Sequence, residues 1–148
     1  MLNEEMKKNV LLISLLVIVL TGCGNNRTVS TKDFRGNCKV IDVKVKDFFK
    51  VYSTKDDGTK WTEKDKEQYE KLIGQKVPRV IVVTIEELDV DKPEIHYLTP
   101  NASIYTIING TIERAQKGQV YYVDLMYFGN NPNPYSGQVS DFKLVKDK

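Results

Sequence analysis

The sequence predicts a mainly β domain with one or two helices, in the form of a small five-stranded barrel preceded by a strand and helix extension. From residue 75 onward, several stretches rich in Val, Ile and Tyr are separated by segments rich in Gly, Asn and Pro. One segment before residue 75 carries clear helix start and stop signals. An apolar run near the N-terminus stands apart from this domain and indicates a leader.

The N-terminal segment has the parts of a secretory signal. Lys7 and Lys8 precede a run from Val10 to Leu20 that is apolar except for one serine. The run is shorter than the roughly 20 apolar residues that cross a bilayer. Met6 gives the signal a more typical start than Met1, because two glutamates then fall outside it. Export from the cytoplasm is therefore expected.

The end of this run, Leu20-Thr21-Gly22-Cys23, resembles the lipobox of bacterial lipoproteins. The resemblance implies that Cys23 carries a diacylglyceryl group and becomes the first residue once the signal peptide, residues 1–22, is removed. Two or more buried acyl chains give stable attachment. We therefore expect a lipid anchor on the extracytoplasmic face of a cell membrane, a flexible tether over residues 23–37 and a globular domain over residues 38–148.

Composition and cysteine content narrow the function classes. The net formal charge is only +2, and residues of both signs are mixed along the chain. A nearly neutral chain argues against nucleic acid as a partner. With Cys23 lipidated, Cys38 has no intrachain partner, and we favour a partly buried side chain over a reactive thiol. The sequence contains no CxxC, HExxH or EF-hand spacing, so we expect no metal and no other cofactor.

The first elements of the domain are a strand and two helical segments. Residues 38–45 alternate, which predicts a half-buried strand with Ile41, Val43 and Val45 inside. Residues 46–52 extend this strand or form one or two helical turns, and we favour the turns. Thr62 as N-cap and Gly74 as terminator bound a helix. Its narrow apolar face comprises Trp61, Tyr69, Leu72 and Ile73.

The remainder of the chain favours β structure. The predicted strands are residues 80–85, 94–99, 103–108, 119–128 and 139–145. Asn109-Gly110 predicts a hairpin turn, and Gly118 ends a short turn before the long strand. In that long strand we expect Tyr121, Val123, Leu125 and Tyr127 to face inward, because Asp124 lies on the other face. Residues 130–137 are expected to form a loop.

This order of elements is that of an OB-fold, a five-stranded Greek-key barrel. Three stretches are similar to motifs of the small extracytoplasmic OB domains called tRNA-anti-like: Tyr69–Val77 with the strand end Thr84–Glu86, Ala115–Val123, and Asp141–Val145. The resemblance covers about residues 47–146 and implies the fold rather than a ligand. An SH3-like barrel or a small sandwich is the alternative architecture.

Aromatic side chains in the β half form the candidate binding face. They are Tyr97, Tyr105, Tyr122, Phe128 and Tyr135. Such residues stack on bases or sugars in OB-folds, or they fill and stiffen a barrel. Among the other polar groups, His96 lies two positions from Glu94 and offers an acid–base pair. The acidic connector, residues 86–94, offers oxygen ligands for calcium but lacks the spacing of a known loop, so a solvated loop is favoured.

We therefore expect a non-catalytic binding or interaction module, tethered at the cell envelope, that recognises a protein, peptide or glycan. One alternative is an envelope enzyme or metal-dependent site that uses His96 and the acidic connector. Another is a purely structural spacer. Ser103 and Ser136 have no nucleophile-elbow context.

Overall fold

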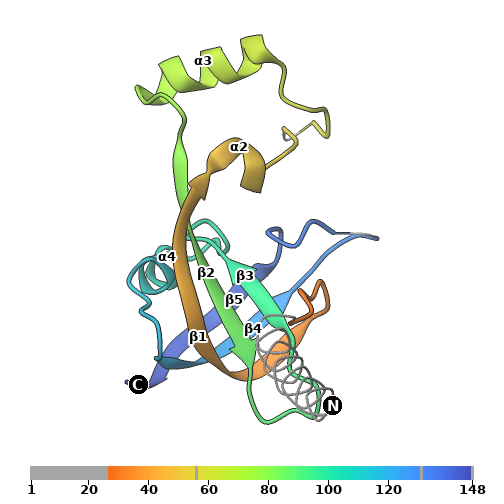
Figure 1. Ribbon diagram of the computed structural model, residues 1–148, viewed down its shortest axis with the longest axis vertical. Coiled ribbons are helices and arrows are strands. Elements are labelled where there is room, and N and C mark those ends of the chain that lie inside the picture. The colour runs from red at the N-terminus through yellow and green to blue at the C-terminus, as the bar shows by residue number, and fades with distance from the viewer. Residues whose placement is uncertain (1–26, 56, 131, 148) are drawn as a thin grey trace, which may run out of the picture.

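The computed structural model describes residues 27–55, 57–130 and 132–147. Five antiparallel strands form one curled sheet in the order β3-β2-β1-β4-β5 (Figure 1). The strands are β1 (Phe34–Asp47), β2 (Arg79–Glu87), β3 (Ile95–Leu98), β4 (Val120–Met126) and β5 (Gln138–Lys146). The helices are α2 (Phe48–Val51), α3 (Glu63–Ile73) and α4 (Thr106–Glu113). The predicted mainly β, OB-like fold is confirmed, although the sheet is not closed between β3 and β5.

The signal peptide, residues 1–22, and the predicted lipid attachment at Cys23 lie outside the described residues. Within residues 27–147, as far as they are described, no helix combines the length and the apolar character that a bilayer crossing requires.

The first strand is central to the sheet, which corrects the prediction that it precedes the barrel. β1 pairs with β2 along one edge and with β4 along the other. It also begins at Phe34, within the expected tether. The five strands of the sheet are therefore β1 and four of the predicted later strands, and residues 103–108 contribute no strand.

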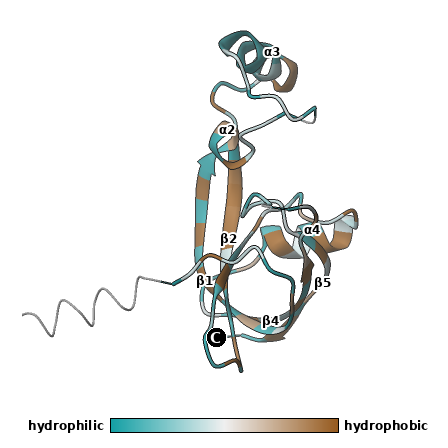
Figure 2. Ribbon diagram, turned by 90° about the vertical axis from the view of Figure 1, so that its right-hand side faces the viewer, coloured by the Kyte–Doolittle hydropathy of each residue, from teal (hydrophilic) through white to brown (hydrophobic). Residues whose placement is uncertain are grey.

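The inward-facing positions of β1 also differ from the prediction. Cys38 and Val40 are fully buried, whereas Val43 is 38% and Val45 57% exposed. The pairing of β1 with β2 shifts register between Val40 and Asp42. A β-bulge inserts one residue, so the odd-numbered side chains beyond it share the face of Cys38 and Val40, and Val43 lies opposite the buried Val83. Beyond this bulge the two strands leave the body as a ribbon, which gives the valines little to pack against (Figure 2).

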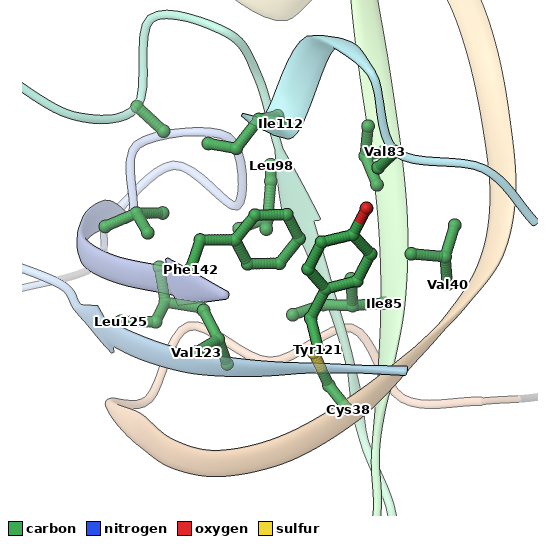
Figure 3. Packing of buried hydrophobic residues seen from close by; sticks show 13 residues of the cluster. Cys38, Val40, Val83, Ile85, Leu98, Ile112, Tyr121, Val123, Leu125 and Phe142 are labelled. Carbon is green, nitrogen blue, oxygen red and sulfur yellow. The ribbon is translucent and has the colours of Figure 1, made fainter. Parts of the chain in front are cut away.

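The core fills the curled sheet and is closed on one side by α4. Tyr121 and Phe142 stack face to face with ring centroids 4.1 Å apart, and Ile112 of α4 lies over them (Figure 3). Tyr121, Val123 and Leu125 are buried and Tyr127 packs partly buried against the same cluster. The predicted inner face of the long strand is thereby confirmed.

The predicted strand at 103–108 and the Asn109-Gly110 hairpin are wrong, because α4 occupies Thr106–Glu113. Ile108 and Ile112 are four residues apart, so both face the core from one side of a helix. The Asn109 side chain bonds both backbone groups of Ser103, at 3.0 and 2.6 Å. Burial of the helix face and this side-chain contact override the local turn preference.

Beyond the sheet, the ends of β1 and β2 carry α2 and α3, and we call these two helices, with the segments that connect them to each other and to β2, the arm (Figure 1). Both helices confirm their predictions. Thr62 and Asp65 form a reciprocal capping box at the start of α3, and Gly74 ends it in the left-handed conformation at φ 71°. No residue of α3 is buried, and Leu72 is 82% exposed, so the expected docking face is only partly used.

Candidate functional site

The arm is held together by a cluster of aromatic side chains. The Phe48 ring of α2 stacks on Tyr69 of α3, with centroids 4.8 Å apart and planes 15° apart. Trp61 contacts both Phe48 and Phe49 edge to face, and its Nε1 donates a 2.8 Å hydrogen bond to the carbonyl oxygen of Tyr52. These contacts position α3 in the absence of any buried residue within that helix.

A hollow of about 660 Å³ opens beside this cluster. It is lined by Phe48, Tyr52, Thr54, Lys55, Asp57, Trp61, Tyr69 and Asn101. Aromatic rings supply much of the wall, and Thr54 and Asn101 offer groups that donate and accept hydrogen bonds. A concave, largely apolar surface with a few polar groups is the general form of a ligand site.

A second, smaller hollow of about 200 Å³ adjoins the first and shares Tyr52 and Asn101 with it. Tyr52 forms the boundary, since its hydroxyl lies 2.8 Å from Oγ1 of Thr99 at the end of β3. Tyr135, from the β4–β5 loop, contributes the far wall of the second hollow. We call the two hollows together the groove. It lies where the arm, the segment after β3 and the β4–β5 loop meet.

Two of the five predicted aromatic residues are brought together, and one of them, Tyr135, lines the groove. Tyr97 of β3 stacks on Tyr135, with centroids 4.9 Å apart and planes 16° apart. The Lys46 ammonium lies over both rings, 5.4 and 5.7 Å from their centroids, and donates to the Tyr135 hydroxyl at 3.3 Å. This cation–π contact ties β1 to the β4–β5 loop.

The charged groups of the groove are largely engaged with each other. Lys55 Nζ lies 3.0 Å from Oδ2 of Asp65. The backbone N–H of Thr62, followed by the Lys55 ammonium, holds the pKa of Asp65 down at about 2. The pKa of Asp57 is also lowered, chiefly by the Thr59 hydroxyl and backbone N–H. With Lys46 over the tyrosines, the groove presents no unengaged cation cluster of the kind that phosphate groups require.

The other three predicted aromatic residues lie elsewhere. Tyr105 and Phe128 share a shallow hollow of about 180 Å³ with Ile104 and Met126, at the start of α4 and the end of β4. Tyr122 lies on the outer face of β4, opposite Asn37 of β1 and Lys143 of β5. The predicted binding face is thus distributed over three separate places.

His96 is a core residue with both ring nitrogens occupied. Its side chain is 0% exposed, Nε2 lies 2.7 Å from Oε2 of Glu87, and Nδ1 lies 3.0 Å from the Tyr127 hydroxyl. Burial raises the pKa of Tyr127, so this phenol stays protonated and donates to Nδ1, while Nε2–H donates to Glu87. The sequence predicts a pair of His96 with Glu94, but in the structure His96 pairs with Glu87 and reaches no solvent.

Two side chains of the acidic connector are engaged, one by an ion pair and the other by hydrogen bonds. Glu86 pairs with Arg27 at 2.8 Å, and Glu87 accepts from the backbone N–H of Glu94 as well as from His96. Within the described part of the chain, no three His, Cys, Asp or Glu side chains are grouped so that they could hold a metal ion.

Sequence reasoning missed the aromatic residues of the arm as site residues. The sequence predicts a helix face for Trp61 and Tyr69 and only helical turns for residues 46–52, and its candidate binding face lies in the β half. The available signal is the separation of β1 and β2 by residues 48–78, an insertion far longer than a hairpin turn and rich in aromatic residues.

Comparisons of the chain with family models, with curated proteins and with solved structures found no match. The fold and the groove together define a class, a small OB-like domain with an aromatic-lined groove between its loops. The function is argued below from that geometry.

Proposed function

We propose that this chain is a non-catalytic binding module, lipid-anchored through Cys23 on the extracytoplasmic face of a cell membrane, with the groove as its ligand site. The observation that carries the binding role is the groove itself. It is formed by three segments far apart in the sequence and is lined by aromatic rings, neutral polar side chains and the two charged residues Lys55 and Asp57. The N-terminal leader and the lipobox-like segment support the location.

The chemistry of the groove favours a neutral glycan chain among the partners considered. Flat rings such as Tyr52 and Tyr69 match the apolar face of a sugar ring, and amide or hydroxyl groups such as Asn101 and Thr54 match its hydroxyls. Because Lys46 and Lys55 are engaged internally, a phosphate backbone has little to bind. An extended peptide is the competing ligand class. The alternative of a purely structural spacer requires that the groove bind no ligand.

The sole tryptophan of the chain provides the test, because Trp61 lines the groove. The full chain is titrated separately with chitohexaose, a proline-rich decapeptide and a dT10 oligonucleotide, and Trp61 emission is recorded. We expect a saturable change with chitohexaose alone. A saturable change with the peptide alone would contradict the glycan proposal and identify a peptide as the ligand class. No change with any probe would contradict a binding role for the groove.

Two variants localise the effect. Asn101→Ala removes an exposed polar group shared by both hollows and should weaken binding about five- to tenfold, corresponding to one lost hydrogen bond of about 1–1.5 kcal/mol. Phe128→Ala alters a 60% exposed side chain in a different hollow and serves as the matched control, with binding unchanged. Equal losses in both variants would exclude the groove as the site.

A further inference from the structure

The segment Arg27–Asp33, which we call the strap, is fixed to the body of the protein. Thr28 accepts a 2.9 Å hydrogen bond from the backbone N–H of Ile95, and Ser30 donates one of 2.8 Å to the carbonyl of Ile95. Arg27 pairs with Glu86 at 2.8 Å, and the Ser30 side chain is only 3% exposed. At its far end, Asp33 accepts from the backbone N–H of Tyr127 at 2.8 Å.

This attachment corrects the expected flexible tether of residues 23–37 over its described part, residues 27–37. Residues 34–37 belong to β1, and the strap runs beside β3, with Val29 bridged to Ile95. Four residue steps separate Cys23 from Arg27, and a fully extended chain covers about 3.6 Å per step. A lipid on Cys23 would therefore hold Arg27 within about 14 Å of the membrane surface.

The groove and the arm lie toward the opposite end of the molecule. β2 runs from Arg79 at the base of the arm to Glu86 beside the strap, a distance of about 23 Å at 3.3 Å per residue. Figure 1 shows α3 at one end of the long axis and the β2–β3 connection toward the other end. The anchor therefore restrains one end of the body and leaves the arm end farther from the lipid.

The charges of the two ends do not set this orientation, which therefore depends on the anchor. The β2–β3 connection carries three acidic side chains, Asp89, Asp91 and Glu94, against the single Lys92, so it has no attraction to anionic lipid and its proximity depends on the anchor. α3 carries four acidic and three basic side chains, so it lacks the basic face with which surface helices bind anionic membranes.

We propose that the strap orients the protein on the membrane: it holds the β2–β3 end next to the lipid headgroups and directs the groove away from them. The inference rests on the proposed anchor at Cys23. Its partner surface is the headgroup layer, and its consequence is that the groove receives ligands from the side facing away from the anchoring membrane.

The test uses the full lipidated chain in vesicles of phosphatidylethanolamine and phosphatidylglycerol that contain a nitroxide-headgroup lipid. Single cysteines replace Lys92 on the β2–β3 connection or Lys71 on α3, both exposed, and each is labelled with a fluorescent maleimide. Cys38 is fully buried and stays unlabelled. We expect quenching of the Lys92→Cys label to be at least threefold stronger than that of the Lys71→Cys label.

Insertion of twelve Gly and Ser residues after Gly24 provides the control, because it lengthens the reach to Arg27 several-fold and should abolish the difference. Equal quenching of the two labels in vesicle-bound protein, or a difference that survives the insertion, would overturn the orienting role and leave the anchor intact. Failure of the protein to float with vesicles, with no diacylglyceryl mass on Cys23, would overturn the anchor and the orientation with it. Groove binding is measured separately and is untouched by either result.

Discussion

Replacing Gly110 by alanine distinguishes the helix of the structure from the hairpin turn that Asn109-Gly110 predicts. Gly110 lies inside α4, where alanine is favoured over glycine by about 0.8–1 kcal/mol. The added methyl group would lie 3.2 Å from Nη1 of Arg114, the far end of a flexible side chain that can move aside. We expect Gly110→Ala to stabilise the fold by about 0.5–1 kcal/mol, or about 3–5 °C in Tm.

The matched control is Gly118→Ala. Gly118 has φ 95°, a conformation that alanine adopts at a cost of about 1–2 kcal/mol. Thermal unfolding followed by circular dichroism, and urea unfolding of the same proteins, should therefore give shifts of opposite sign. A hairpin turn would place Gly110 at positive φ. Destabilisation of both variants to a similar extent would refute the helical assignment of residues 106–113.

Three further predictions concern the core and the titrating groups. Ile112→Ala should cost about 2–5 kcal/mol in urea unfolding because this side chain is fully buried, whereas Ile107→Ala in the same helix, 82% exposed, should stay within about 0.5 kcal/mol. Burial raises the pKa of Cys38 to about 12, so in a Cys23→Ser variant its reaction with Ellman's reagent at pH 8 should be about a thousandfold slower than in urea, and comparable rates would contradict the buried thiol. The pKa of Asp65 is lowered from 3.8 to about 2, so its contribution to α3 is present above pH 4 and is lost as the pH falls toward 2; helical circular dichroism should decrease over that range, and Asp65→Asn should remove this step.

The elements that the sequence predicted correctly are those whose determinants are local. Thr62 and Gly74 bound α3 because a cap acts on backbone groups within one turn of itself. The alternation of the long strand predicted β4 and its buried face, since side chains two apart share a face whatever the partner strand is. The groove is only partly predicted. The sequence names Tyr97 and Tyr135 as candidates, but the two rings stack because the β4–β5 loop folds back toward β3, and the sequence does not reveal the path of that loop.

The predictions that failed depend on distant partners. The central place of β1 is decided by β2 and β4, and its register by a bulge near Ile41 that no local preference marks. His96 was paired with Glu94 from their spacing along one strand. In the folded hairpin, Ile85 lies opposite His96, which brings Glu87 from the neighbouring strand to the ring instead.

The arm combines a well-formed hollow with weak local stabilisation, and this combination bears on how the groove would bind. α3 buries none of its residues, and it is held against α2 and the preceding loop by the aromatic cluster and the contact between Lys55 and Asp65. A segment with so little burial opens at a small fraction of the global unfolding free energy. A ligand that contacts both Tyr69 on α3 and Asn101 on the body would bind the closed arm only, so binding would shift this opening equilibrium. Amide exchange in residues 63–73 should then slow in proportion to ligand occupancy while exchange in β4 stays unchanged, because the core strands open only with the whole domain.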